Sequence, residues 1–378
     1  MQSRPYWTAL IEERWRKRPL LWLRGVRRAG KTTLCRSLEN VEYFDCELPR
    51  HRRAMQDPEA FLDGLRGRRV VLDEIHRLDE PSQLLKIAHD HFPTIRVIAT
   101  GSSTLGATKK FRDTLTGRKD EIRLTPAIHT DLEALRVRSL GKRLFQGGLP
   151  PFLLAKEFPE REYQEWLDSY WAKDIQELFR LERRASFLRF TELVFASSGG
   201  IFEATRFAAP CEVSRTTIAT YLSVLDATSV ATIVRPYSTS KSSEIVSAPK
   251  VYAFDTGFVS HARGWASLRD DDRGPLWEHY VLNELLGRLQ LHEVKYWRDK
   301  AGHEVDFVLA RRGKPLLAVE CKWSADHFES AGFGAFSGRY PKADYCVVAS
   351  DVERPFKRRT QGIEVEYLGL EHLADRLA

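Results

Sequence analysis

The stretch Leu20-Leu-Trp-Leu-Arg-Gly-Val-Arg-Arg-Ala-Gly-Lys-Thr-Thr-Leu34 decides the fold of this chain. It begins with an apolar run that predicts a buried β-strand, continues as a loop between Gly25 and Gly30, and ends where a helix is expected to begin. The two glycines, followed by Lys31 and Thr32, fill every fixed position of the phosphate-binding pattern G-x-x-x-x-G-K-[ST]. The sequence therefore predicts a nucleotide site in an α/β domain.

Each part of this loop has a chemical role in binding ATP and Mg²⁺, the cofactors we expect. Backbone N–H groups of the loop surround phosphate oxygens, the lysine reaches the β- and γ-phosphates, and the threonine hydroxyl joins the Mg²⁺ shell. The nucleotide-binding residues predicted on this basis are Gly25, Arg28, Ala29, Gly30, Lys31, Thr32 and Thr33, with Thr32 also a metal ligand. The alternative is an ordinary glycine turn beside a surface lysine.

Two acids follow the next predicted buried strand, Arg69-Val-Val-Leu-Asp-Glu. We expect Asp73 to hold Mg²⁺ through water and Glu74 to polarise the water that attacks the γ-phosphate. If the later strand from Arg96 lies between the two strands that carry these motifs, it brings Ser102 to the nucleotide; the alternative for Ser102 is a cap of the next helix.

Composition limits the class of protein. A chain of 378 residues is too long for one ordinary core, so we expect several domains. No apolar run is long enough to span a membrane, and the first residues lack an apolar signal core, which predicts a cytoplasmic protein. Five scattered cysteines argue against a disulfide framework or a zinc cluster, and the net charge of +7 favours an anionic partner such as nucleic acid.

The middle of the chain is predicted to be helical and then to form a winged helix over residues 186–248. Its parts are expected helices at 187–198 and 201–208, a helix capped by Ser214, and two strands at 231–236 and 244–248. The predicted DNA contacts are Arg215, Thr216, Thr217 and Lys241, mainly to phosphates. Winged helices also dock proteins, so that alternative stays open.

A predicted hairpin near the C-terminus brings acids together. Asp306 and Glu320 are equally distant in sequence from Gly313, so a hairpin centred there places them opposite each other across two strands. Lys322 is two residues after Glu320 and shares its face. Two carboxylates that bind Mg²⁺ and a lysine that orients the nucleophile would suit phosphodiester hydrolysis, although a surface hairpin with paired charges is the alternative.

The order of these motifs, with Gly117-Arg118 and Gly147-Gly148-Leu149-Pro150 after the strand from Arg96, resembles the archaeal-type group of AAA+ ATPases that carry a resolvase-like nuclease domain. The resemblance covers nearly the whole chain. It implies that residues 131–185 form a helical lid and that Arg118 is a catalytic arginine finger inserted into a neighbouring subunit, in a ring or open helical oligomer such as a hexamer. The alternative for Arg118 is a solvated charge beside Lys119.

The C-terminal acids match the PD-(D/E)xK pattern of Holliday junction resolvases and restriction-type nucleases. That resemblance implies catalytic roles for Asp306, Glu320 and Lys322, with Glu278 as an additional metal-binding acid and Glu284 as the competing choice. The proline of the motif is absent, because the residues before Asp306 are His-Glu-Val.

The predicted architecture is α/β in four parts: an AAA+ P-loop ATPase domain (1–130), a helical lid (131–185), a winged-helix domain (186–248) and an α/β restriction-endonuclease-like domain (249–378). The predicted function is ATP hydrolysis by an oligomeric protein that acts on duplex or branched DNA and could cut it with Mg²⁺. The alternative is a regulatory nucleotide switch whose C-terminal domains dock DNA or protein without translocation or cleavage.

Overall fold

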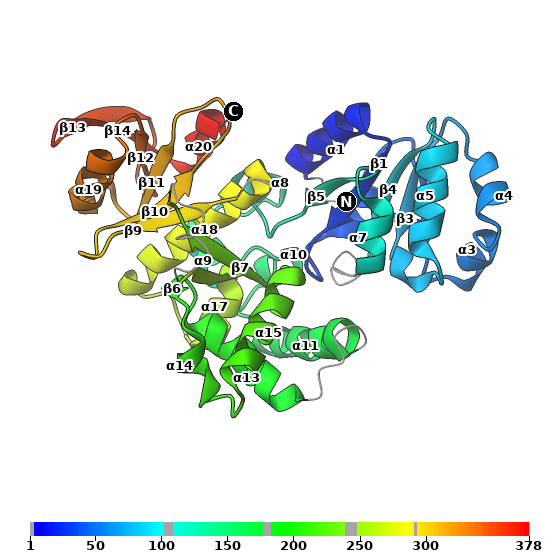
Figure 1. Ribbon diagram of the computed structural model, residues 1–378, viewed down its shortest axis with the longest axis horizontal. Helices are drawn as coiled ribbons and strands as arrows, with labels where there is room; N and C mark the ends of the chain where they lie inside the picture. The colour runs from blue at the N-terminus through cyan, green and yellow to red at the C-terminus, as the bar shows by residue number, and fades with distance from the viewer. Residues whose placement is uncertain (1–3, 102–108, 177–182, 239–247, 291–292, 378) are drawn as a thin grey trace.

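The structure is a computed structural model that describes residues 4–101, 109–176, 183–238, 248–290 and 293–377 (Figure 1). The P-loop domain forms one end of the elongated molecule, and the C-terminal sheet lies at the other end. Helices from the middle of the chain lie below both in this view. No helix within the described ranges has the length and apolar character that crossing a bilayer requires.

In its described part, the P-loop domain is built on a five-stranded parallel sheet in the order β2-β3-β4-β1-β5. Its strands are β1 (Leu20–Arg24), β2 (Glu42–Asp45), β3 (Arg69–Asp73), β4 (Arg96–Thr100) and β5 (Asp120–Arg123). The flanking helices are α1 (Pro5–Lys17), α2 (Lys31–Arg36), α3 (Pro49–Ala54), α4 (Pro58–Asp63), α5 (Pro81–His91) and α7 (Lys109–Leu115). The strand from Arg96 lies between the two strands that carry the phosphate-binding and acidic motifs, so the condition for Ser102 to reach the nucleotide is met.

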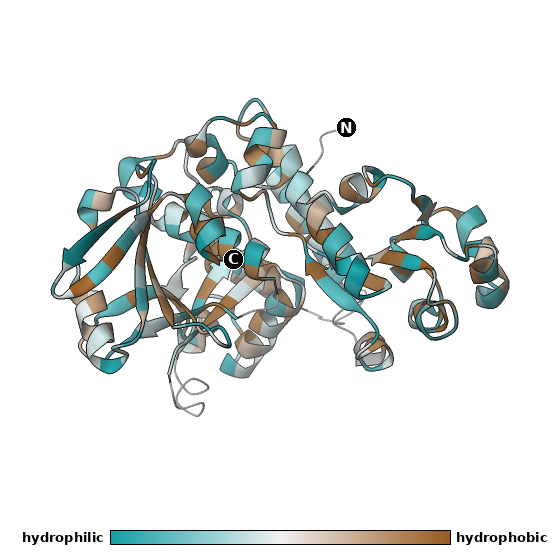
Figure 2. Ribbon diagram, turned by 90° about the horizontal axis from the view of Figure 1, so that it is seen from above, coloured by the Kyte–Doolittle hydropathy of each residue, from teal (hydrophilic) through white to brown (hydrophobic). Residues whose placement is uncertain are grey.

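Alternation along β1 explains why this sheet is covered on both faces. Leu20 and Trp22 pack into one hydrophobic cluster, whereas Leu21 and Leu23 pack into the other. Successive side chains of a strand point to opposite faces, so an entirely apolar strand requires cover on both sides. Figure 2 shows brown segments along the strands of this sheet and many hydrophilic turns in the helices around them.

The middle of the chain is mainly helical, as predicted. Its helices are α8 (His129–Ala134), α9 (Leu140–Phe145), α10 (Pro150–Leu153), α11 (Glu160–Tyr170), a π-helical turn (Trp171–Ile175), α13 (Arg184–Ala196), α14 (Ala204–Ala208), α15 (Arg215–Ala227), α17 (Thr256–Ala262) and α18 (Asp270–Leu289). The expected helix 201–208 is wrong at its start, because Gly200–Ile201 is a short strand (β6) and the helix begins at Ala204.

Among the residues that the structure describes, the second sheet has nine strands in the order β13-β14-β12-β11-β10-β9-β7-β8-β6. The remaining strands are β7 (Ala231–Pro236), β8 (Lys250–Ala253), β9 (Lys295–Arg298), β10 (Glu304–Leu309), β11 (Leu317–Lys322), β12 (Asp344–Ala349), β13 (Phe356–Thr360) and β14 (Ile363–Leu368), with helices α19 (Ala331–Arg339) and α20 (Leu370–Leu377). β7 pairs with β8 on one side and with β9 on the other. One sheet therefore joins the middle of the chain to its C-terminal part.

One strand prediction in this region needs correction. The second strand expected at 244–248 lies almost wholly outside the described residues. The antiparallel neighbour of β7 is β8, and Ile233 is opposite Val251. The sequence analysis had placed 250–253 after the end of the winged helix, whereas the hydrogen-bonded ladder makes it the neighbour of β7.

Candidate functional site

The P-loop joins the end of β1 to the start of α2. A Cβ on Gly25 would lie 2.5 Å from the backbone oxygen of Leu124, so no larger residue fits there without movement of the backbone. Gly30 has a φ of 95°, in the left-handed region that glycine adopts without strain. These two positions give the loop backbone the concave shape that phosphate-binding loops have, and a nucleotide phosphate would fit it for this reason.

Lys31 extends inside this concavity. Its ammonium nitrogen donates to the carbonyl oxygens of Gly25 at 2.8 Å and Val26 at 3.2 Å. Burial lowers the pKa of Lys31, and the negative charges of Glu74 and Asp174 oppose that effect. The lysine is thus held by its own loop, in the place from which it would contact phosphate oxygens.

Asp73 ends β3 and is held from both sides of its strand. Its carboxylate accepts hydrogen bonds from the hydroxyl of Tyr43 on β2 and from that of Thr100 on β4. Sequence analysis missed both partners, because neighbouring strands in a parallel sheet are distant in sequence. Ser102, predicted to reach the nucleotide from the same β4 end, lies outside the described residues.

Glu74 follows Asp73 with a φ of 55°, a left-handed conformation that a non-glycine residue seldom adopts. Its amide donates to Thr100 Oγ1 at 3.2 Å, and its carboxylate lies 3.1 Å from Nδ1 of His76. Burial acts to raise the pKa of Glu74, but the His76 hydrogen bond and the charge of Lys31 outweigh it and lower this pKa. Glu74 is therefore ionised at neutral pH and able to accept a hydrogen bond from water.

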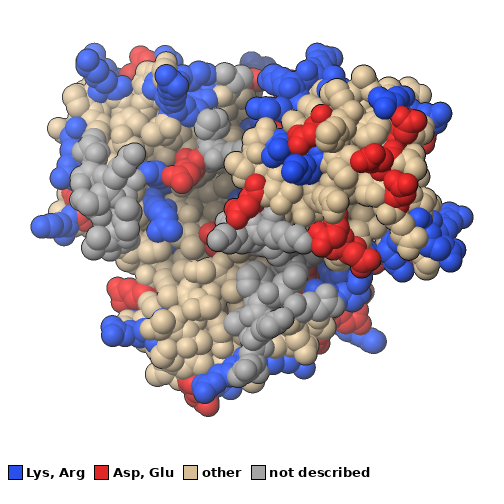
Figure 3. Space-filling view, turned by 45° about the vertical axis from the view of Figure 1, so that its right-hand side comes forward, with Lys and Arg blue, Asp and Glu red and all other residues tan. Residues whose placement is uncertain are grey.

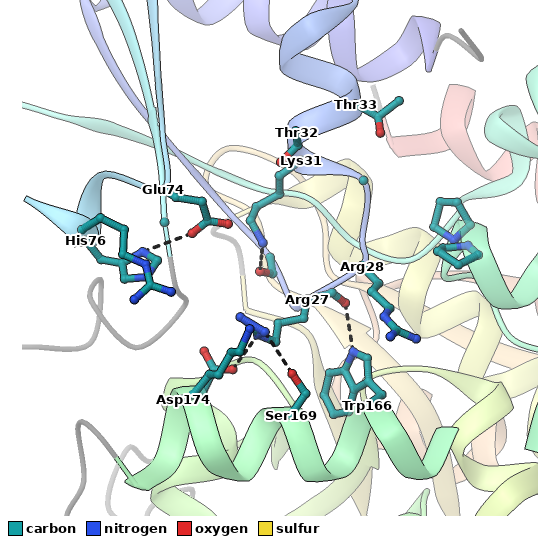
Figure 4. Close-up of a pocket in the computed structure, with 17 residues that line it drawn as sticks. Arg27, Arg28, Lys31, Thr32, Thr33, Glu74, His76, Trp166, Ser169 and Asp174 are labelled. Carbon is teal, nitrogen blue, oxygen red and sulfur yellow. Dashed lines mark hydrogen bonds and ion pairs between the residues drawn. The ribbon is translucent and has the colours of Figure 1, made fainter. Parts of the chain in front are cut away.

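These residues surround a cavity of about 500 Å³ (Figure 4). The P-loop and the β3 end form one side of it, and α10, α11 and the π-helical turn form the other. Its lining includes five Lys and Arg side chains and two carboxylates: Arg27, Arg28, Lys31, Arg77, Lys173, Glu74 and Asp174. Thr32 and Thr33 line the cavity as well. The excess of positive charge suits a ligand that carries several phosphates.

A helical wall closes this cavity opposite the P-loop. Arg27 Nε lies 3.0 Å from Asp174 Oδ2, and its Nη1 donates to Ser169 Oγ at 3.1 Å. Trp166 Nε1 donates to the backbone oxygen of Arg27 at 3.1 Å. Sequence analysis placed none of these contacts, because they join segments far apart in the chain.

The segment Gly147-Gly148-Leu149-Pro150 connects the cavity to α17. Asp255, which caps α17, accepts hydrogen bonds from the amides of Gly148 at 2.6 Å and Gly257 at 2.9 Å. A Cβ on Gly147 would lie 1.7 Å from Asp255 Oδ1. The close approach explains the pair of glycines, and Pro150 and Pro151 line the cavity directly after it.

Arg118 lies away from this cavity. Its Nε lies 2.9 Å from Asp90 Oδ1, and its Nη1 donates to the backbone oxygen of Thr114. The hydrogen bond from Arg118 lowers the pKa of Asp90 to about 2. Within the described part of a single chain, Arg118 therefore contacts no residue that lines this cavity. An arginine that acts on another subunit would have to lie away from the cavity of its own chain.

The C-terminal acids are brought together by the predicted hairpin. Phe307 pairs with Val319 in the β10–β11 ladder, and the same register places Asp306 opposite Glu320. Lys322 Nζ lies 3.0 Å from Glu320 Oε1. Burial and the charge of Glu320 raise the pKa of Asp306, and burial raises that of Glu320.

Of the two candidate additional acids, Glu278 lies with this group and Glu284 does not. Glu278 accepts a hydrogen bond from Tyr252, and its charge raises the pKa values of Asp306 and Glu320. Glu284 is buried against α8, where it accepts from the amide of His129 at 2.7 Å and pairs with Arg288 at 2.8 Å.

Sequence analysis missed a lysine among these acids. Lys250 Nζ, from β8, lies 2.5 Å from Glu304, 3.3 Å from Glu278 and 4.0 Å from Asp306. Burial acts to lower the pKa of Lys250, but the three carboxylates outweigh it and raise this pKa. Across the described ranges, no three His, Cys, Asp or Glu side chains have the arrangement of a metal site.

The residues predicted to contact DNA begin α15. Ser214 caps this helix by accepting from the amide of Thr217 at 3.1 Å, as predicted, and both Arg215 and Thr216 are exposed. Lys241 lies outside the described residues. On the face shown in Figure 3, Lys and Arg side chains are spread around the margins and alternate with acids.

Three family matches cover most of the chain. Residues 17–132 match the AAA domain family, residues 137–269 match a domain of unknown function, DUF8612, and residues 273–368 match another, DUF4143. Two uncharacterized proteins, from Mycobacterium tuberculosis and Mycobacterium bovis, are each 28% identical over 315 residues, which is 79% of this chain and 69% of the relative.

Solved structures resemble the chain more weakly. A Walker-type ATPase of Pyrococcus abyssi has a TM-score of 0.46 at 17% identity, over 70% of this chain and 96% of that one. A half-complex of Thermococcus gammatolerans McrB AAA+ hexamers with McrC has a TM-score of 0.25 at 10% identity, over 74% and 75% of the two chains. The family match, the parallel sheet and the P-loop together identify an AAA+ P-loop ATPase-like domain in the N-terminal part.

Proposed function

We propose that this protein hydrolyses ATP with Mg²⁺ at the cavity between the P-loop and α11. One observation carries the proposal: Lys31, which starts α2 after β1, and Glu74, which follows the β3 residue Asp73, line one cavity with an excess of positive charge. Lys31 would bind phosphate oxygens, and Thr32 with Asp73 would hold Mg²⁺. Bound Mg²⁺ would neutralise the charge that develops on the phosphates.

Glu74 would orient and polarise the attacking water. Its lowered pKa keeps it ionised, and the left-handed backbone directs it differently from a residue that continues the strand. Asp73, in contrast, accepts two hydrogen bonds from the protein, which fix its carboxylate but leave it less able to activate water. The two acids therefore have different tasks.

The test separates nucleotide binding from hydrolysis. Lys31→Ala should weaken ATP binding, whereas Glu74→Gln should keep ATP affinity within a few-fold and reduce the turnover rate by at least about 100-fold. Lys17→Ala and Glu59→Gln, at exposed positions on α1 and α4, are the matched controls. An equal loss of ATP affinity in both test variants would contradict the role of Glu74.

DNA is the partner we propose for the remainder of the chain. The net charge of +7, the capped helix α15 with exposed Arg215 in its first turn, and the strand β7 that follows it support a winged helix on DNA phosphates. Neutralising one duplex phosphate fewer should flatten the salt dependence of DNA affinity by roughly 0.9 in log–log slope. Arg215→Ala should do this, with Arg206→Ala on α14 as control; an unchanged slope would place the DNA surface elsewhere.

A second candidate is a nucleotide switch whose C-terminal part docks DNA or protein without cutting. The observation that favours it is Lys250, whose ammonium nitrogen lies 3.3 Å from Glu278 and 4.0 Å from Asp306, two of the acids that a nuclease would use for Mg²⁺. Slow ATP turnover that DNA does not stimulate, together with the absence of metal-dependent nicking of duplex, forked and four-way DNA, would support the switch, and fast DNA-stimulated turnover would exclude it. Nicking that Glu320→Gln abolishes would support the nuclease instead.

A further inference from the structure

Arg27 is the P-loop residue that reaches across the nucleotide cavity. Figure 4 shows its side chain directed away from the loop toward Asp174 and Ser169 on the opposite wall. The guanidinium contacts Asp174 Oδ2 at 3.0 Å and Ser169 Oγ at 3.1 Å. The side chain of Arg27 remains 34% exposed although Asp174 is 3% exposed, so the arginine borders the open cavity while its acid lies behind it.

Asp174 belongs to a short irregular helix. Residues Trp171–Ile175 form a π-helical turn that continues α11, and such turns are frequent at functional sites. The same helix contacts the backbone of Arg27 through Trp166. Arg27 is therefore bound to α11 twice, by its carbonyl oxygen and by its guanidinium group.

The charges of this wall act on those of the P-loop. Asp174 opposes the lowered pKa of Lys31, and Arg27 contributes to lowering the pKa values of both Lys31 and Glu74. These four groups thus interact within one cavity. Asp174 is the acid that neutralises Arg27 when no phosphate is bound.

We propose that Arg27 is a phosphate-binding residue that exchanges Asp174 for the γ-phosphate of the bound nucleoside triphosphate. This inference rests on the proposed function. The γ-phosphate is the relevant group because Glu74, which would orient water toward it, lines the same cavity as Arg27. A guanidinium group matches two phosphate oxygens in one plane, and a phosphate of higher charge competes well with a single carboxylate.

The exchange has a structural consequence. When Arg27 turns to phosphate, the ion pair between the P-loop and α11 is broken, while the contact from Trp166 to the Arg27 backbone can persist. A triphosphate and a diphosphate then differ in whether the wall is held by Asp174. Nucleotide state is thereby communicated to the helix that leads toward the C-terminal half.

The experiment compares affinities for a non-hydrolysable ATP analogue and for ADP, measured by titration calorimetry on the full chain with Mg²⁺. Arg27→Ala should lower the affinity for the triphosphate analogue by about 10- to 100-fold, the range for one or two charge-assisted hydrogen bonds. It should lower the affinity for ADP by less than about 3-fold. Arg27→Lys should give an intermediate loss. Asp174→Asn should raise the affinity for the triphosphate analogue several-fold, because it removes the charge that competes with phosphate for Arg27.

Two matched control variants change residues of α11, the helix that carries Ser169. Arg161→Ala removes an exposed arginine that pairs with Glu165, and Asp168→Asn removes an exposed acid that pairs with Arg184. If Asp174→Asn fails to fold, Ser169→Ala provides the milder test: it removes one hydrogen bond to Arg27 and should also strengthen triphosphate binding.

Opposite signs decide the outcome. If the ion pair were merely structural, Arg27→Ala and Asp174→Asn would both lower the affinities for the ATP analogue and for ADP. Ser169→Ala would do the same where it replaces Asp174→Asn. That result would overturn the inference. Equal losses for ATP analogue and ADP in Arg27→Ala would overturn it as well. The proposed function fails separately, if the unsubstituted chain binds neither nucleotide or if Lys31→Ala leaves both affinities unchanged.

Discussion

The ammonium nitrogen of Lys250 lies 2.5 Å from Oε1 of Glu304, so a strand from the middle of the chain provides the counter-charge for acids on the C-terminal hairpin. Glu278 completes the arrangement at 3.3 Å from the same nitrogen. A buried cluster of carboxylates requires a positive charge, which can be a metal ion or a lysine. In this chain the lysine takes that position.

Replacing Lys250 should therefore change the metal response of the protein. Lys250→Gln should cost about 3–5 kcal/mol of unfolding free energy, because it leaves buried acids without their partner. Millimolar Mg²⁺ or Mn²⁺, without nucleotide, should then raise the thermal midpoint of the variant more than that of the unsubstituted chain. Differential scanning calorimetry of the full chain measures both effects.

The double variant Lys250→Gln with Glu304→Gln is the control, since it removes one acid with the lysine and should lose part of the metal response. If the unsubstituted chain shows a large metal stabilisation that Asp306→Asn removes, then Lys250 does not exclude the ion. That outcome would restore the metal site expected from Glu278, Asp306 and Glu320.

Residue patterns within short stretches of the sequence predicted the features of the fold that are determined by neighbouring residues. The P-loop, the buried strands and the hairpin register around Gly313 follow from residue spacing and alternation, which act over short stretches of chain. The position of Ser214 as a helix cap was likewise readable, because a cap and its amide lie within one turn.

Contacts between distant segments were not predictable in this way. Lys250 lies in Lys-Val-Tyr-Ala, a strand whose pairing with β7 depends on the whole sheet. Arg27 and Asp174 are separated by most of the ATPase domain and the helices after it. A lysine inside an apolar strand was a usable signal, since buried lysines require acidic partners; nothing comparable marks Arg27, because arginine is common in exposed loops.

Gly147 should tolerate alanine much less than another glycine of similar conformation. Gly147 and Gly264 both have positive φ, at 73° and 62°, so both substitutions strain the backbone. Only at Gly147 does the new Cβ meet an atom, Asp255 Oδ1 at 1.7 Å; at Gly264 nothing lies within 4 Å. Urea unfolding should show Gly147→Ala to be less stable than Gly264→Ala by about 1–3 kcal/mol, and equal losses would contradict the packing argument.

Arg118 should matter for turnover and little for stability. Its ion pair with Asp90 is at the surface, so Arg118→Ala should leave the midpoint of urea unfolding close to that of the unsubstituted chain. If Arg118 acts on a neighbouring subunit, mixing Arg118→Ala chains with Glu74→Gln chains should restore ATPase activity at interfaces that combine an intact arginine with an intact glutamate. Activity of the mixture no higher than the sum of the two separate variants would contradict action between subunits.

His279 should make the protein less stable in mild acid. Burial lowers its pKa from 6.5 to about 3, and the charges of Arg143 and Arg263 contribute, while a backbone hydrogen bond involving Ala253 opposes the shift. Above pH 6.5 neither the folded nor the unfolded chain binds a proton at this residue; between pH 6.5 and about 3 only the unfolded chain does. This residue should therefore lower the unfolding free energy by up to about 1.4 kcal/mol for each pH unit below 6.5.

His279→Asn removes that contribution, so the stability difference between the original chain and the variant, measured by urea unfolding from about pH 7 to about pH 5, should shrink as the pH falls. His91→Asn, at an exposed position that ends α5, is the matched control. A difference that stays constant with pH would mean that His279 is protonated in the folded protein, and its burial against Tyr252 and Ser198 would then need another explanation.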